Sequence, residues 1–409
     1  MNPQLPGRVE FIVLTAFLTS ITALAIDAML PALPEIAHTL GVADPNHAQL
    51  IISVLFIGLA VGQILFGPVS DSAGRKPLIY AGLGLFVIGS AISMFSTNFT
   101  IMLVGRFLQG LGAASSRVIT MALVRDCFVG RAMAQVMSFT MMVFILVPAL
   151  APALGQGIIY LAGWRAVFLM FIILAGVVCL WFVLRMPETL PKEKRIPFAW
   201  AQQQEAVMTI VKDKHAMIYS VISGVIFGAF MGYLNSVQQV LQVQYGLGSQ
   251  FPLYFAITAL AVGIASFVNA KLVMRLGMRL LSRRALIVMT FLSGLFLVIE
   301  WLNKGQPSLW LLMPYLIVLF FCVGLLFGNL NALAMETLDK YVGMGASVVG
   351  TVSNIVAIPL GTWIGQSYNG TVQPLVLGFT VLSAVGLLLM YWVESLPSPA
   401  QATPPATTH

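Results

Sequence analysis

Residues 11 to 30 read FIVLTAFLTSITALAIDAML, and this stretch decides the fold class. The only charged residue in it is Asp27. A helix of ~20 apolar residues, rising 1.5 Å per residue, is long enough to cross the hydrocarbon core of a bilayer. We therefore predict a membrane-spanning helix over 9–31, with an aspartate near one of its ends.

The rest of the chain repeats this composition. Of its 409 residues, 59% are hydrophobic and only 9% are charged, whereas soluble domains carry roughly 25% charged residues. A membrane β-barrel would show alternating segments of ~10 residues, and the sequence instead has long continuous apolar runs. The composition predicts an all-α integral membrane protein.

Apolar runs of spanning length recur along the chain, and the longest polar stretch, 186–215, divides them into two groups of six. The twelve predicted spans are 9–31, 47–68, 77–96, 99–123, 133–159, 165–185, 216–244, 250–274, 283–302, 309–335, 342–367 and 372–394. We expect two pseudo-symmetric six-helix bundles over 1–186 and 216–396. A linker over 187–215 would join them, and the Pro/Ala/Thr-rich residues 397–409 are predicted to be a disordered tail.

The basic residues are distributed very unevenly between the two sides of this arrangement. Arg165 and Lys304 are the only bases expected on one side, while most of the 21 Lys and Arg residues fall in loops on the other. Because loops rich in Lys and Arg stay in the cytoplasm, we expect both termini and the linker there. The same distribution explains the net charge of +7 without nucleic-acid binding. The first run lacks a basic segment and a cleavage site, which predicts a retained helix rather than a signal peptide.

No catalytic or metal-binding set is recognisable in the spans. The three cysteines are single residues without CxxC spacing, and the four histidines fall in loops or the tail. The phosphate-binding pattern GxxxxGK[ST] is absent, which argues against an ATP-driven pump. We expect neither an enzyme nor a cofactor or metal site, and the sequence alone leaves a channel open.

The polar turn after the second span reads GPVSDSAGRKPLI, residues 67–79. Its pattern G-x-x-x-D-x-x-G-[RK]-[RK] resembles the loop signature of the major facilitator superfamily, whose secondary transporters have two six-helix halves. Ser72 stands where that family usually has a base. A degenerate echo, with Gly277 and Arg279, follows the eighth span. The resemblance implies a gate at the cytoplasmic side, formed here by Gly67, Asp71, Gly74, Arg75 and Lys76.

Other segments extend the resemblance. The fourth span contains VGRFLQGLGAAS (104–115), which matches a superfamily motif through Arg106, Gln109, Gly110 and Gly112. In the fifth span, VPALAPALGQG (147–157) resembles the antiporter motif, although Ala151 replaces the usual glycine. Its helix-bending and close-packing positions are Pro148, Pro152 and Gly155.

DAMLPALPEIA (27–37), SSRVITMALVRD (115–126) and GWRAVF (163–168) resemble the bicyclomycin-resistance (Bcr/CflA) branch of drug:proton antiporters. The resemblance implies transport by alternating access in a bacterial inner membrane, driven by protons without a cofactor. The implied partners are a small-molecule substrate, protons and the lipid bilayer. Because one chain holds both halves, a monomer is expected.

Charges inside the spans are costly, at ~2.5–3.5 kcal/mol or more at mid-bilayer, and they mark candidate functional positions. Asp27 lies ~27 Å along its span and Arg106 ~10 Å below the same surface, so the two have similar depth. We hypothesise that they neutralise each other in part, and that Asp27 with Arg106 couples transport to protons. Two alternatives stay open, an interfacial Asp27 and an Arg106 that bonds backbone carbonyls.

Further polar residues complete the candidate binding surface. Arg117 follows Arg106 by about three helical turns, so both start from the same face of the helix. The alternative is that the Arg117 side chain extends to the cytoplasmic surface instead of facing the interior. The seventh span carries a polar stripe at helical spacing, whose alternative role is hydrogen bonding between helices. The candidate substrate-binding residues are Asp27, Arg106, Gln109, Arg117, Tyr233, Asn235, Gln238 and Gln242.

The sequence favours a proton-coupled exporter of small amphipathic compounds, antibiotics included. The alternative is a dedicated exporter or importer of one metabolite, siderophore or nucleoside-like compound.

Overall fold

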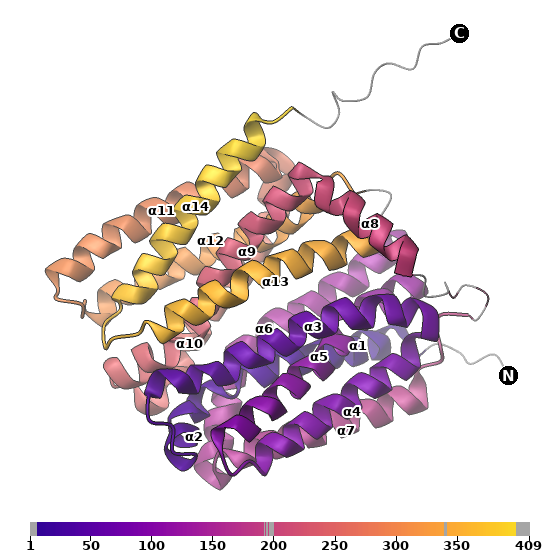
Figure 1. The fold of residues 1–409 in the computed structure, drawn as a ribbon, viewed down its shortest axis with the longest axis horizontal. Coiled ribbons are helices and arrows are strands. Elements are labelled where there is room, and N and C mark those ends of the chain that lie inside the picture. The colour runs from indigo at the N-terminus through magenta and orange to yellow at the C-terminus, as the bar shows by residue number, and fades with distance from the viewer. Residues whose placement is uncertain (1–5, 192, 194, 196–199, 339–341, 398–409) are drawn as a thin grey trace.

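The structure, a computed structural model, describes all residues except 1–5, 192, 194, 196–199, 339–341 and 398–409. The expected tail therefore lies almost entirely outside the described residues. Two groups of antiparallel helices stand side by side, one in indigo to magenta and the other in pink to yellow (Figure 1).

The first half contains α1 to α7. Their bounds are α1 Arg8–Asp27, α2 Leu33–Thr39, α3 Leu50–Ala73, α4 Arg75–Met94, α5 Phe99–Cys127, α6 Gly130–Ala162 and α7 Arg165–Arg185, with short 3-10 turns η1 Leu30–Ala32 and η2 Pro45–Gln49. Helix α5 packs along both α3 and α4. This contact is close because Gly110 lies against the Leu55 carbonyl of α3, and Gly112 against the Gly82 carbonyl of α4.

The second half contains α9 to α14. Their bounds are α9 Lys214–Leu234, α10 Phe251–Leu276, α11 Met278–Leu302, α12 Leu309–Met335, α13 Val342–Gln366 and α14 Gln373–Ser395, with η4 Gln238–Gln244 and η5 Gly248–Gln250 between α9 and α10. Within this half α9 packs on α12, α13 and α14.

These helices confirm the predicted all-helical membrane fold. Eleven helical segments in the described part of the chain are long and apolar enough to cross a membrane. The remaining predicted span, 133–159, lies in α6, which is helical over Gly130–Ala162. Within α6, the segment Leu146–Ala162 is apolar but shorter than a full membrane span. In the part of α6 before Leu146, the structure does not describe several of the side chains.

The linker contains a helix that the sequence did not indicate to us. Helix α8, Trp200–Lys212, contacts α9 and α13 and lies across one end of the bundle (Figure 1). We call this the α8 end, and the opposite end, which holds α2, η1 and η4, the α2 end.

Two predicted spans are interrupted at the α2 end. Helix α1 ends at Asp27, and Pro31 and Pro34 then occupy the first turns of η1 and α2. In the second half α9 ends at Leu234, and the chain continues as the wider π-type helix η4. The predicted spans 9–31 and 216–244 lie within segments long and apolar enough to cross a membrane, Arg8–Thr39 and Lys214–Gln244, and each of these segments is interrupted toward the α2 end. The two breaks face each other, since η1 contacts η4.

Candidate functional site

The two halves are joined at the α2 end by uncharged side chains, which we call the outer polar cluster. Its members are Asn46, Gln49, Ser53, Asn235, Gln238, Gln239, Thr362, Gln366 and Tyr368. Ser53 of α3 accepts from the Asn235 amide at 3.1 Å and from the Thr362 hydroxyl at 2.9 Å. The Gln49 amide donates to Gln238 at 3.3 Å. Each of these bonds crosses from one half to the other.

Asn46 extends the cluster toward the surface. Its amide donates to the carbonyls of Gln366 and Tyr368, at 3.1 and 2.8 Å, and its side-chain oxygen accepts from Gln239 at 2.7 Å. Burial raises the pKa of Tyr368, so its hydroxyl stays a neutral donor to Gln244 and to the Gln239 carbonyl. Beside these residues lies an open cavity of about 360 Å³. Among the described residues, no ion pair joins the two halves at this end.

The predicted polar stripe belongs to this cluster. Asn235 caps α9, while Gln238 and Gln242 lie in η4 and bond to each other at 3.3 Å. The stripe does not continue along a single α-helix, because α9 ends before it. Asn235 and Gln238 each bond to the other half, which is the role that the alternative interpretation gave them. Whether they also contact a substrate stays a prediction.

Asp27 is the last residue of α1 and is 5% exposed. Among the described residues its carboxyl group has no hydrogen-bond or ion-pair partner. Gly155 of α6 packs onto the carbonyl of Ala28, where an added Cβ would lie 2.0 Å from that oxygen. The antiporter-like segment therefore brings α6 against the residue that follows Asp27.

Asp27 lies near the second half, because η1, which follows it, contacts η4, and Tyr233 lies at the end of α9 just before η4. The phenol ring stacks on Phe255, at 6.1 Å between centroids, and its hydroxyl bonds to Thr258 at 2.8 Å. Two of the predicted substrate-binding residues, Asp27 and Tyr233, thus come from different halves and lie on the same side of the molecule. Both lie at the breaks of α1 and α9.

Arg106 does not neutralise Asp27, so the expected ion pair is wrong. Its fully buried guanidinium donates to the Ala25 carbonyl at 2.8 Å and to the Ile51 carbonyl at 3.1 Å. A third bond goes to Gln109, whose amide donates to Ser90 at 2.9 Å. The predicted match in depth holds, since Ala25 is two residues from Asp27. The guanidinium nevertheless donates its hydrogen bonds to acceptors on α1, α3 and α5, and none to the Asp27 carboxyl group.

Arg117 lies further along the same face of α5 and is exposed, unlike Arg106. Eleven residues correspond to about three turns, so the two side chains start within about 20° of each other around the helix. This face is closed toward the α2 end, where Thr22 of α1 bonds to the Ala113 carbonyl. Further along this face, toward the α8 end, the Arg117 side chain is exposed.

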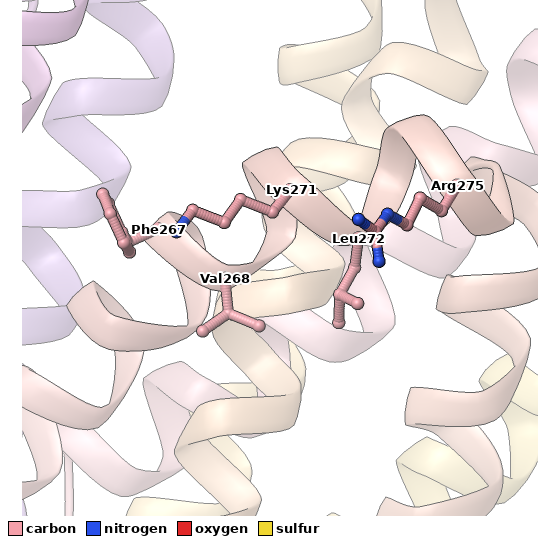
Figure 2. Close-up of a pocket in the computed structure, with 5 residues that line it drawn as sticks. All are labelled: Phe267, Val268, Lys271, Leu272 and Arg275. Carbon is pink, nitrogen blue, oxygen red and sulfur yellow. The ribbon is translucent and has the colours of Figure 1, made fainter.

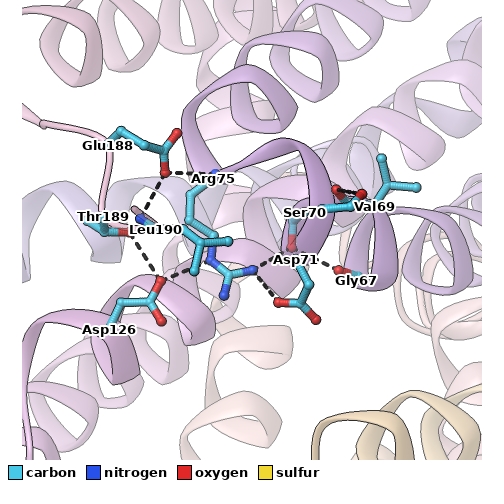
Figure 3. A network of polar contacts seen from close by, with 10 residues as sticks. Gly67, Val69, Ser70, Asp71, Arg75, Asp126, Glu188, Thr189 and Leu190 are labelled. Atoms are coloured by element: carbon cyan, nitrogen blue, oxygen red, sulfur yellow. Dashed lines mark hydrogen bonds and ion pairs between the residues drawn. The ribbon is translucent and has the colours of Figure 1, made fainter. Parts of the chain in front are cut away.

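The predicted gating residues meet at the α8 end, around the 2% exposed Arg75 (Figure 3). Its guanidinium bonds to Asp71 at 2.7 Å, to Ser70 at 2.8 Å and to Asp126 at 2.9 Å. The turn itself requires Gly74, whose φ is +105°, and the echo Gly277 has φ +77°. Gly67 of the same motif faces Ser347 of α13.

Two acids of this network were missed by the sequence analysis, Asp126 and Glu188. Glu188 accepts from the backbone N–H groups of Arg75 and Lys76, at 2.9 and 3.1 Å, and so caps the start of α4. Lys76 donates to the Met186 carbonyl. The bonds of this network join α3, α4, α5 and the start of the linker.

Comparison with known proteins agrees with this architecture. The family model described as Major Facilitator Superfamily matches residues 15–362. The chain belongs to the major facilitator superfamily. It is therefore a multi-pass membrane transporter and not an enzyme.

Relatives of similar length are known in bacteria. The chain is 29% identical to the uncharacterized MFS-type transporter YdgK of Bacillus subtilis, over 95% of this chain and 96% of that one. It is 28% identical to the bicyclomycin resistance protein homolog of Haemophilus influenzae, over 97% and 98%. Identity to the multidrug resistance protein MdtL of Citrobacter koseri is 27%, over 94% and 96%.

A solved structure has the same fold. The human organic anion transporter MFSD10 superimposes with a TM-score of 0.70, covering 95% of this chain and 100% of that one. Its sequence identity of 19% limits this likeness to the fold.

Proposed function

We propose that this superfamily member is a proton-coupled exporter of small amphipathic compounds, of the bicyclomycin-resistance type. The observation that carries the proposal is Asp27, a buried carboxyl group without a partner among the described residues, at the break of α1. A carboxylate in such a position is stabilised by taking up a proton. The names of the H. influenzae and C. koseri relatives support an exporter of drugs.

The proposed orientation places the α8 end and both termini in the cytoplasm of a bacterial cell. It is supported by the basic loops at that end, since Lys and Arg collect on the cytoplasmic side. With the α2 end held closed by the outer polar cluster, a substrate would enter from the α8 end. A monomer suffices for this cycle, because both halves belong to one chain.

In the proposed cycle, deprotonated Asp27 belongs to the state that takes up substrate from the cytoplasm. Opening of the α2 end then exposes Asp27 to the outer solution, and its protonation accompanies release of the substrate. The proton leaves toward the cytoplasm when the α2 end closes again. Arg106 takes the part of a positioning residue, because it ties the end of α1 to α3 and α5.

The test is transport by the purified chain in proteoliposomes with an imposed pH gradient. The panel contains bicyclomycin and amphiphiles of matched size that are cationic, neutral or anionic. We expect several members to move uphill, and only while the gradient lasts. Movement of a single compound would favour the dedicated transporter, and transport independent of the gradient would contradict proton coupling.

A further inference from the structure

A cavity of about 500 Å³ lies on α10 near the α8 end and is lined by five residues of that helix (Figure 2). They are Phe267, Val268, Lys271, Leu272 and Arg275. Figure 2 shows the Lys271 ammonium beside the Phe267 ring, and the distance from the nitrogen to the ring centroid is 5.0 Å. The cavity thus combines an apolar floor with two cations.

Both cations lack an acidic partner in the described part of the chain. Lys271 contacts only the Phe267 ring, and Arg275 forms no hydrogen bond or ion pair there. Their neighbours on the next helix differ. Arg279 pairs with Glu336 at 2.9 Å, and Arg283 pairs with Glu394 at 2.8 Å. Positive charge is therefore left uncompensated at the cavity.

The cavity lies on the side of α10 that faces away from the protein core. Asn269 marks the core side, because it exchanges hydrogen bonds with Asn329 of α12, and Lys271 points about 200° away around the helix. A stripe of apolar residues 36% to 68% exposed leads along that outer side to the cavity. It consists of Leu253, Ile257, Leu260, Ile264 and Phe267.

We propose that this cavity binds the phosphate group of an anionic membrane lipid. In a bilayer the exposed stripe contacts acyl chains, and about one and two turns beyond it Lys271 and Arg275 reach the level of the headgroups. The two uncompensated cations of α10 supply the charge that such a headgroup needs. The bound lipid bridges the apolar stripe and the unpaired cations of the second half. This assignment does not depend on which compound the protein transports.

The test is titration of the purified full-length chain with phosphatidylglycerol, followed by native mass spectrometry. We expect the double variant Lys271→Gln/Arg275→Gln to bind this lipid roughly 30-fold more weakly, about fivefold for each cation. Phosphatidylcholine binding should not change, which also shows that the variant is folded. The matched control is Lys212→Gln/Lys214→Gln, which removes the same charge from exposed positions at α8 and α9.

Equal weakening in the control would show a response to net charge and overturn the site, as would unchanged binding in the double variant. Glycerol phosphate added in competition distinguishes a lipid from a free phosphate. We expect it to leave phosphatidylglycerol bound at matched concentration, because it cannot contact the apolar stripe. Displacement at that concentration would assign the cavity to soluble phosphates and overturn the lipid proposal.

Discussion

Arg106 bonds to the Ala25 carbonyl, two residues before Asp27, but the two charged groups differ in their hydrogen bonding. Arg106 is fully buried and uses its planar group to bond two carbonyls and one amide. Asp27 is buried to a similar degree and has no such partner among the described residues. A satisfied cation stabilises one arrangement of helices, whereas an unsatisfied acid is suited to change its charge.

Replacement of Arg106 by lysine keeps the charge and removes the planar set of donors. We expect Arg106→Lys to unfold at a lower temperature than the wild type, because hydrogen bonds of charged groups contribute ~1.5–3 kcal/mol each. Thermal unfolding in detergent measures this difference. The control is Arg8→Lys, at an exposed arginine with one bond to the Ala132 carbonyl. Equal unfolding temperatures for the two variants would contradict the bonding role of Arg106.

Close helix packing in the first half depends on glycines at defined positions of the elements. Gly110 of α5 touches the Leu55 carbonyl, where an added Cβ would lie 2.1 Å from the oxygen. Gly84 of α4 has no atom within 4 Å of the corresponding point. Replacing each glycine by alanine therefore separates two effects on stability, the change in helix propensity, which occurs at both positions, and the clash with a neighbouring helix, which occurs only at Gly110.

We predict that Gly110→Ala separates α5 from α3 and lowers the yield of folded protein, because backbone atoms at 2.1 Å cannot give way. Gly84→Ala should be neutral or slightly stabilising, since alanine favours helices by about 1 kcal/mol over glycine. Size-exclusion profiles and thermal unfolding compare the two. Normal folding of Gly110→Ala would show that α5 and α3 are not packed this closely.

The elements were largely predictable from the sequence, and so was the break after α1, where Pro31 and Pro34 stand, but the break after α9 was not. Long apolar runs fix where a chain can cross a bilayer, and Gly74 and Gly277 marked equivalent turns in both halves. In the run 216–244, six of the ten residues after Leu234 are polar, and the sequence analysis assigned them to one polar face of a continuous helix rather than to a break. Helix α8 escaped notice because its residues are too polar to resemble a span.

The depth of Arg106 and Asp27 in the membrane was predictable from the sequence, but their hydrogen-bond partners were not. Helical rise placed Arg106 at the level of Asp27, but only the packing of α1 and α3 reveals that carbonyls occupy its donors. Asp126 and Glu188 were missed because they stand far along the chain from Arg75. Their approach depends on how α5 and the linker return to the start of α4.

At the scale of the whole molecule, contacts between halves differ between the two ends. The α2 end is joined by the outer polar cluster, whose groups keep their charge state across physiological pH. The α8 end carries the Arg75 network inside the first half, and Arg117, which lies toward this end of α5, is exposed. Asp27 stands near the junction of the halves, so a change in its charge is placed to affect which end opens.

The measurement that tests this account most directly is uphill, gradient-driven transport by Asp27→Asn in proteoliposomes. The matched control is Glu35→Gln, which neutralises an exposed carboxyl group eight residues later. The account predicts that Asp27→Asn loses uphill transport while Glu35→Gln keeps it, with both variants folded and equally incorporated. Undiminished uphill transport by Asp27→Asn would contradict the claim that this residue carries the coupled proton.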